Sequence, residues 1–306
     1  AVLVKDGKIV GKDYHHKYGE FHAERNAILN CKEDLAGASL YVTLEPCCHY
    51  GKTPPCTQII IEKGIKKVYI GSYDPNPKVN GGGIKQLKDA GIEVVTEVLK
   101  EECDALNPVF FHYIEKKEPY VVLKYAMTAD GKIATRTGAS KWITGEAARK
   151  RVQYSRKIYS GIMVGIGTVL ADDPMLTCRL ENAQNPVRII CDSSLRIPLD
   201  SNIVKTAKEV PTIIACTVAK EDKGNLKKDL TIKEKIETLQ QAGCEVLPIG
   251  RTKTGVDLKE LMKLLGEKGI DSILLEGGSS LNYSALQAGI VSKVETYIAP
   301  KIFGGE

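Results

Sequence analysis

The sequence predicts a two-domain α/β protein. Short apolar runs typical of strands alternate with helical patterns along the whole chain, which favours layered sheets covered by helices. The length of 306 residues exceeds that of a usual single domain. The charged segment Glu115–Pro119 ends in a proline and separates two halves of different character. We therefore expect domains at residues 1–116 and 117–306.

Each element of the first half has a local signal. Asp6-Gly7 lies between two strand-like runs and predicts a hairpin turn. His15 and His16 are expected to be exposed loop residues. A helical pattern over 101–114 is expected to break at Asn107-Pro108. The other expected elements alternate in type: a helix over 22–30, a strand over 39–44, a helix over 56–63, a strand over 67–70, a helix over 84–90 and a strand over 92–95.

The second half carries further strands and two glycine-rich turns. A helix is predicted over 146–159, with Arg149, Arg151 and Arg156 on its surface. Gly165 and Gly277 each follow a strand, and the turn at Gly277 opens a helix, where free N–H groups can bind phosphate. Two such turns suit a dinucleotide, although two tight turns would explain the same glycines. The expected strands are apolar runs, at 120–125, 162–164, 187–191, 212–216, 244–247, 272–275 and 294–298.

A zinc-site motif organises the first domain. His22 and Glu24 begin one helix, Cys47 follows a strand, and Cys56 begins another helix. One imidazole and two thiols leave the fourth tetrahedral position open, as in catalytic zinc sites. This order is the zinc-deaminase signature, in which the glutamate moves protons and does not bind the metal. Eight residues separate the cysteines, where the signature usually has two. The alternative is a group of buried cysteine thiols beside a histidine whose ring nitrogens are hydrogen-bonded within the protein.

Composition limits the class of partner. A net charge of +5 fits a small anionic substrate and is too weak to indicate nucleic acid. No apolar run is long enough to span a bilayer, and no signal peptide is recognised, so we expect no membrane partner and a cytoplasmic location. The 9 cysteines are expected to be reduced thiols. We also expect a homo-oligomer.

Motifs in both halves resemble one family, the bifunctional riboflavin-biosynthesis deaminase–reductases. The motifs are His22-Ala23-Glu24, Leu44–Cys47, His49–Cys56, Asp74–Pro77, Lys141–Thr144, Gly167–Pro174, Glu276–Gly278 and Ala299–Lys301. The resemblance implies a cytidine-deaminase-like three-layer domain followed by a dihydrofolate-reductase-like α/β domain. It implies zinc-dependent deamination of 2,5-diamino-6-ribosylamino-4(3H)-pyrimidinone 5′-phosphate, then reduction of its ribosyl side chain to ribityl by NADPH. The long spacing between the cysteines is this family's own form.

The resemblance also implies residue roles. His22, Cys47 and Cys56 would hold zinc, and Glu24 would transfer protons. Substrate would be bound by His49, Lys52 and Asn76 in the first domain and by Lys124, Ser140, Arg156, Leu176, Arg179 and Glu276 in the second. NADPH would be bound by Ala126, Trp142, Thr168, Asp172, Ser193, Gly278, Ser279, Ser280, Leu281, Asn282, Tyr283 and Ser284. Trp142 is the only tryptophan, and core packing is the alternative reading for it.

The sequence departs from the usual pattern of this family at two positions, Cys48 and Gly145. Cys48 stands where relatives often carry serine, and Gly145 stands where they carry serine after Trp-Ile-Thr.

One rival function is that of a nucleic-acid or nucleoside deaminase with a non-catalytic second domain. A nucleic-acid deaminase should have a basic, aromatic-lined channel, yet aromatic residues make up 6% of the chain. Another rival is a zinc-stabilised scaffold, which would unfold when its metal is removed.

Overall fold

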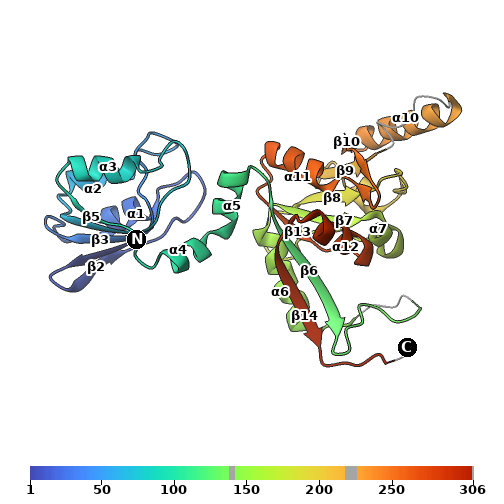
Figure 1. Ribbon diagram of the computed structural model, residues 1–306, viewed down its shortest axis with the longest axis horizontal. Coiled ribbons are helices and arrows are strands. Elements are labelled where there is room, and N and C mark those ends of the chain that lie inside the picture. The colour runs from blue at the N-terminus through green and yellow to red at the C-terminus, as the bar shows by residue number, and fades with distance from the viewer. Residues whose placement is uncertain (138–141, 218–225, 305–306) are drawn as a thin grey trace. The chain divides into compact units, whose positions relative to one another are not determined.

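The structure is a computed structural model that describes residues 1–137, 142–217 and 226–304. The chain divides into two compact units, Ala1–Glu115 and Lys116–Glu306 (Figure 1). This division lies one residue from the boundary expected from the charged segment. Among the described residues, no helix combines the length and apolar character needed to cross a bilayer.

The first unit is built on a five-stranded sheet with the order β2-β1-β3-β4-β5. Its strands are β1 (Val2–Lys5), β2 (Lys8–Lys12), β3 (Ser39–Leu44), β4 (Lys67–Ser72) and β5 (Glu93–Val95). β1 pairs antiparallel with β2 and β3, whereas β3, β4 and β5 are parallel. The predicted hairpin is confirmed, with Asp6 and Gly7 both at positive φ in its turn. The parallel strands all end on the side where the metal motif lies.

Helices cover both faces of this sheet. The helices of this unit are α1 (Ala23–Asn30), α2 (Cys56–Glu62), α3 (Gly82–Asp89), α4 (Lys100–Leu106) and α5 (Pro108–Lys116). α1, α2 and α3 bury Ile28, Ile60 and Leu87 against the apolar face of the strands. α4 packs on the opposite face at Gly71, where any Cβ would collide with Cys103. The result is the predicted three-layer arrangement. The helix break at Asn107 is confirmed.

The second unit is built on a seven-stranded sheet with the order β10-β9-β8-β7-β13-β6-β14, in which every pairing is parallel. Its strands are β6 (Tyr120–Thr128), β7 (Gly161–Gly165), β8 (Val187–Cys191), β9 (Thr212–Cys216), β10 (Cys244–Pro248), β13 (Ser272–Leu275) and β14 (Val291–Ala299). The seven predicted strands are confirmed. β13 inserts between β6 and β7, so the strand order reverses there. Ligands of open parallel sheets bind at such a reversal, outside the carboxyl ends of the strands.

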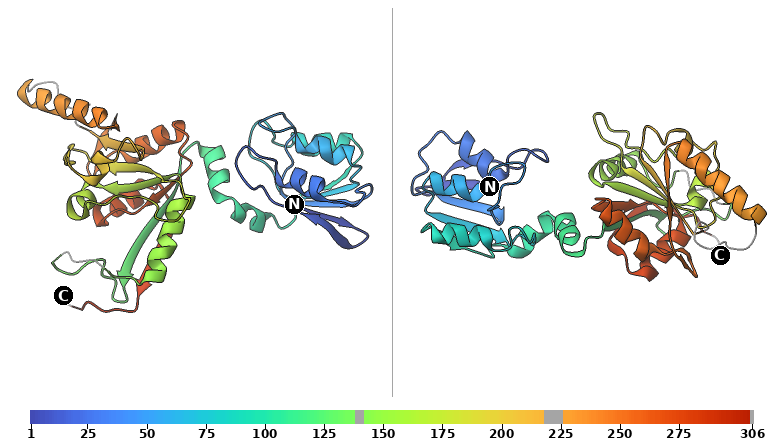
Figure 2. Two further views of the ribbon diagram at one scale, coloured as in Figure 1. Left: turned by 180° about the vertical axis from the view of Figure 1, so that it is seen from behind. Right: turned by 90° about the horizontal axis from the view of Figure 1, so that it is seen from above.

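β6 and β14, at one side of this sheet, extend beyond β13. β13 pairs with β6 only over residues 120–123, whereas β14 pairs with β6 as far as Thr128. β6 and β14 therefore continue together as a two-stranded ribbon beyond the sheet (Figures 1 and 2). The chain turns after Thr128, and the Asp130 carboxylate accepts hydrogen bonds from the backbone N–H groups of Phe303 and Gly304.

Two apolar clusters lie on the two faces of the parallel sheet. One contains Met163, Leu261 and Ala285, and it is covered by α11 and α12. The other contains Ile190 and Leu239, and it is covered by α7, α8 and α10. The remaining elements of the unit are α6 (Glu146–Ile158), α7 (Ile166–Asp172), α8 (Asn202–Lys205), α10 (Leu226–Gln241), β11 (Arg251–Thr252), β12 (Gly255–Val256), α11 (Leu258–Glu267) and α12 (Ser279–Ala288).

One predicted glycine-rich turn has a different structure. Gly165 is the last residue of β7 and the N-cap of α7, so Ile166 already lies in a helix. Gly167 therefore belongs to the first helical turn and not to a loop. The second turn is as predicted, because Gly277 and Gly278 connect β13 to α12 and Gly278 is the N-cap.

Candidate functional site

The three predicted ligand residues of the first unit converge. His22 Nδ1 lies 3.4 Å from Cys47 Sγ and 3.7 Å from Cys56 Sγ. All three candidate ligand atoms lie within 4.8 Å of one another, and no other such group occurs among the described residues. Zinc bonds of about 2.3 Å to sulfur and about 2.0 Å to nitrogen place tetrahedral ligand atoms roughly 3.5 to 3.8 Å apart. The arrangement therefore has the spacing and the donor types of a zinc site.

Local backbone structure positions each of the three side chains. His22 is the N-cap of α1 and has extended backbone angles. Cys47 follows the end of β3, and Cys56 is the first residue of α2 after the N-cap Pro55. The Cys56 backbone N–H donates to Cys47 Sγ at 3.3 Å. A helix N-terminus thus faces the sulfur and favours the thiolate.

Hydrogen bonds and burial set the electrostatics of this site. The Cys56 thiol donates to Cys47 Sγ, and this contact, assisted by His22, holds the pKa of Cys47 well below its usual range. The Cys47 sulfur in turn raises the pKa of His22. Glu24 is 8% exposed. Its burial raises the pKa of the carboxyl, which suits a group that accepts and releases protons near neutral pH.

Glu45 is a residue of the site to which the sequence assigned no role. Its side chain is 3% exposed. The carboxylate accepts hydrogen bonds from the backbone N–H groups of Gly81, Gly83 and Ile84, at 3.0, 2.9 and 3.1 Å. It therefore anchors the N-terminus of α3 next to the Pro46–Cys47 segment. A glutamate directly before a Pro-Cys ligand was the available signal for this role.

The predicted substrate residues of the first unit lie on two loops. His49 and Lys52 lie between Cys47 and Cys56, and Asn76 follows β4. His49 Nδ1 is buried and has no hydrogen-bond partner. Asn76 is half-buried, and its side-chain oxygen accepts from the Lys78 backbone N–H at 3.1 Å. Lys52 is exposed, and its ammonium lies 3.9 Å from the centroid of the Tyr18 ring.

In the second unit the structure brings three predicted substrate residues together. Arg156 donates to both carboxylate oxygens of Glu276, at 2.8 and 3.1 Å. Burial lowers the pKa of Lys124, and the charge of Glu276 partly opposes this effect. The expected surface position of Arg156 is wrong, because its side chain is 14% exposed. The glutamate, distant in sequence, draws the guanidinium inward.

The other predicted substrate residues are placed differently. Arg156 also donates to the Thr177 carbonyl at 3.0 Å, which connects it to the segment that carries Leu176 and Arg179. Leu176 is buried and Arg179 is exposed. Ser140 lies outside the described residues.

A cavity of about 470 Å³ lies at the carboxyl ends of β7 and β8. Four predicted cofactor residues line it, namely Ser193, Ser280, Leu281 and Ser284. The sequence missed the wall formed by Asp192, Ser194, Arg196, Thr254, Val256 and Leu258. Asp192 to Ser194 directly follow β8, and polar residues at a strand end were the missed signal. The cavity volume lies within the usual range for small-molecule sites.

The remaining predicted cofactor residues do not line this cavity. They are Ala126, Trp142, Thr168, Asp172, Gly278, Ser279, Asn282 and Tyr283. Asn282 directly follows the cavity-lining Leu281 in the sequence, and the buried Oδ1 of Asn282 has no hydrogen-bond partner. Trp142 is 63% exposed, so core packing is wrong for this residue. Arg149 lies 4.6 Å from the centroid of the Trp142 ring, and Lys301 donates to the Trp142 carbonyl at 2.8 Å.

Comparison with known proteins identifies the family of each half of the chain. Residues 1–72 match the cytidine and deoxycytidylate deaminase zinc-binding region, and residues 119–306 match the RibD C-terminal domain. The chain belongs to the RibD family. The RibD riboflavin biosynthesis protein of Actinobacillus pleuropneumoniae is 61% identical over 306 residues, covering 100% of this chain and 78% of that protein. RibD of Escherichia coli strain K12 is 39% identical over 100% of this chain and 82% of its own length.

Solved structures of RibD proteins share the fold. A diaminohydroxyphosphoribosylaminopyrimidine deaminase/5-amino-6-(5-phosphoribosylamino)uracil reductase from Thermotoga maritima matches with a TM-score of 0.82 and 40% identity, covering 99% of this chain and 80% of that one. RibD from Acinetobacter baumannii matches with a TM-score of 0.81 and 35% identity over the same shares. The predicted fold class and the predicted bifunctional deaminase–reductase of riboflavin biosynthesis are confirmed. The rival with a non-catalytic second domain is set aside.

Proposed function

We propose that the first unit uses zinc to deaminate 2,5-diamino-6-ribosylamino-4(3H)-pyrimidinone 5′-phosphate, and that the second unit reduces the ribosyl side chain of the product with NADPH. The observation that carries the first half is the convergence of His22 Nδ1, Cys47 Sγ and Cys56 Sγ at tetrahedral spacing. The names of the relatives described above support the pathway and both reaction types.

In this proposal zinc is held by His22, Cys47 and Cys56. When bound, the metal supplies a water activated near neutral pH. The buried Glu24 carboxylate would accept one proton from the attacking water and pass it to a ring nitrogen. It would then accept the second proton from the added hydroxyl group and pass it to the amino group, which leaves as ammonia when its bond to carbon breaks. The raised pKa of Glu24 supports this role, because a carboxyl that is easily protonated can both accept and return a proton.

His49, Lys52 and Asn76 are proposed to bind the substrate of the first reaction. The unpartnered Nδ1 of His49 supports this, since a buried ring nitrogen without a hydrogen bond favours a polar ligand. The exposed Lys52 ammonium suits the phosphate as a point charge. Asn76 would contribute its amide, of which the oxygen already accepts one backbone hydrogen bond.

The cavity beside β7 and β8 is proposed as the NADPH site. α12 has Gly278 as its N-cap and no side-chain cap, so its first N–H groups are available to a phosphate. Two buried acceptors, Asp192 Oδ1 and Asn282 Oδ1, have no partner and suit hydroxyl or amide donors of a dinucleotide. Arg196 lines the cavity and would favour the 2′-phosphate that distinguishes NADPH from NADH.

When bound, the nicotinamide cofactor supplies the hydride, and the protein positions the sugar against it. Lys124, Arg156 and Glu276 are proposed to bind that sugar phosphate and its hydroxyl groups. Their clustering, with Arg156 fixed by the Glu276 carboxylate, supports this role. Ser140, Leu176 and Arg179, together with the predicted cofactor residues outside the cavity, remain proposals from the resemblance. The homo-oligomer also remains a prediction.

The deciding experiment assays the purified protein with the diaminopyrimidinone phosphate and scores two products separately. We expect ammonia release without added NADPH and oxidation of NADPH only after ammonia has been released. Oxidation of NADPH without ammonia release would contradict the proposed order of reactions. Calorimetric titration of the Arg196→Gln variant should show weakened binding of NADPH and unchanged binding of NADH. Equal weakening of both would remove Arg196 from the 2′-phosphate site.

A further inference from the structure

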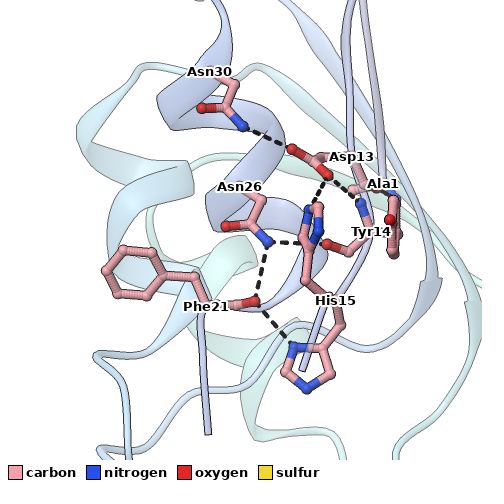
Figure 3. Close-up of polar contacts among 8 residues, drawn as sticks. Ala1, Asp13, Tyr14, His15, Phe21, Asn26 and Asn30 are labelled. Carbon is pink, nitrogen blue, oxygen red and sulfur yellow. Dashed lines mark hydrogen bonds and ion pairs between the residues drawn. The ribbon is translucent and has the colours of Figure 1, made fainter. Parts of the chain in front are cut away.

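The segment from Asp13 to Phe21 is fixed to helix α1 at two points (Figure 3). Asn30 donates to Asp13 Oδ2 at 2.7 Å, and Asp13 Oδ1 accepts from the Tyr14 backbone N–H at 2.8 Å. Asn26 donates to the carbonyl oxygens of Tyr14 and Phe21, at 2.9 and 3.2 Å. The segment is exposed, yet its two ends are held by side chains from the helix that begins with His22. Its path is therefore set before any ligand arrives.

This fixed segment borders the metal site and reaches across to the loop that carries Lys52. The His15 Nδ1–H group donates to the Phe21 carbonyl oxygen at 3.0 Å, and the His15 ring meets the His22 ring edge-on with centroids 5.5 Å apart. At the tip, the Tyr18 ring lies against the Lys52 ammonium at 3.9 Å from the centroid. A Cβ on the neighbouring Gly19 would be 3.4 Å from Lys52 Cδ. The tip of the segment therefore contacts the charged end of this lysine through Tyr18 and lies close to its stem at Gly19.

We propose that Tyr18 is a positioning residue that holds the Lys52 ammonium for the anionic group of the deaminase substrate. The inference rests on the proposed role of Lys52 in substrate binding. The ring occupies one side of the ammonium through a cation–π contact. The other N–H donors of Lys52 remain available to a phosphate.

The physical reason is the flexibility of lysine. A free lysine side chain has four rotatable bonds, and fixing it on binding lowers the affinity for the ligand. Tyr18 is 84% exposed, so it contributes little to the apolar core. Its contact with Lys52 restricts that side chain before substrate binds. Because an exposed cation–π contact is weak, its loss should change substrate affinity by about two- to five-fold.

The test compares steady-state ammonia release by single and double variants of the full chain. Tyr18→Leu should raise KM by about two- to five-fold with kcat unchanged. Tyr18→Phe keeps the aromatic ring and should have the same KM as the original protein. In a Lys52→Met background, Tyr18→Leu should have no further effect. Tyr50→Leu is a matched control, because Tyr50 is an exposed tyrosine on the Lys52 loop whose hydroxyl donates to Gln58.

The outcomes separate this inference from the proposed function. If Lys52→Met leaves KM unchanged, the proposed phosphate contact is wrong and the inference fails with it. If Lys52→Met raises KM but Tyr18→Leu does not, only the role of Tyr18 is wrong. The inference is also overturned by additive effects in the double variant, by a lower KM in Tyr18→Leu, or by equal effects of Tyr18→Leu and Tyr18→Phe. Zinc content is measured in every variant, and loss of zinc in Tyr18→Leu would show a structural role instead.

Discussion

The burial of a single residue, Glu24, favours the proton transfer proposed for it. Its carboxyl lies in the first turn of α1, two residues from His22, and it is shielded from water. We predict that Glu24→Gln keeps zinc and lowers kcat for ammonia release by about two to four orders of magnitude, because only the proton carrier is lost. Metal analysis and steady-state kinetics check both parts. Glu20→Gln, an exposed change on the preceding loop, is the control and should behave like the original protein.

Lys124 gives a prediction about pH. Burial lowers the pKa of Lys124 in the folded state, so the folded protein releases this proton at a lower pH than the unfolded chain does. The charged lysine therefore destabilises the fold at neutral pH, and this penalty disappears as pH rises from the lowered pKa toward the ordinary value of about 10.4. Urea unfolding of the Lys124→Met variant, compared with the original protein across this range, should show a difference that shrinks as pH rises. A constant difference would contradict the lowered pKa.

Some residues of the candidate sites can be predicted from the sequence, and others cannot. The convergence of His22, Cys47 and Cys56 was predictable, because each lies close to the end of a helix or strand with its own local signal. Asp192 and Thr254 were not, because they meet only when the loops after β8 and between β11 and β12 fold over one cavity. The inward position of Arg156 was also hidden, because it depends on Glu276, a partner 120 residues away in the chain.

At the scale of elements, the packing of α3 supports the metal site. The α3 N-terminus is held by Glu45, and Gly83 lies directly against the Pro46 carbonyl oxygen, where any Cβ would collide. We predict that Gly83→Ala weakens zinc retention and lowers stability by about 1–3 kcal/mol, because α3 must move away from the segment that carries Cys47. Chelator competition and thermal unfolding measure the two effects. Gly145→Ala is the control, since a Cβ at Gly145 meets open space.

A single buried arginine joins several elements of the second unit. Arg188 on β8 is fully buried, and within the described part of the chain its guanidinium donates to neutral oxygens, including the hydroxyls of Thr212 and Thr206. The carbonyls of Met175, Ile203 and Val210 accept from it, so α8 and the segments that flank it are tied to β8. We predict that Arg188→Met lowers the stability of the second unit by about 3 kcal/mol or more, because these buried acceptors lose their donors.

Thermal unfolding followed by circular dichroism tests this prediction. The exposed Arg151→Met change is the control and should shift the unfolding temperature little. Zinc content should stay constant in both variants, because Arg188 belongs to the other unit. Loss of zinc from Arg188→Met would mean that the two units do not unfold separately.

The elements were largely predictable, whereas their pairing was not. Short apolar runs located the strands, and Asp6-Gly7 and Asn107-Pro108 marked a turn and a break. No local signal showed that β14 pairs with β6, since about 170 residues separate the paired positions Val291 and Val121 in the chain. The short β11–β12 hairpin, which carries part of the cavity wall, also lacked a strong signal.

At the scale of the whole molecule, the two reactions are assigned to two compact units with separate apolar cores. We predict that chelation of zinc abolishes ammonia release and leaves reduction of the separately supplied deaminated intermediate unchanged. The reason is that an open catalytic site loses activity when its metal is removed, while the second unit has no ligand in that site. Loss of both activities would show that the metal stabilises the whole chain.

The position of Trp142 makes the second unit optically distinct. The chain has 1 tryptophan, and its ring is in contact with water on one side and with Arg149 on the other. Its fluorescence therefore originates from the reductase half alone, with the red-shifted emission of a hydrated indole. Unfolding and ligand titration of the second unit can thus be followed through a reporter that the sequence already contains, and tryptophan emission carries no signal from the first unit.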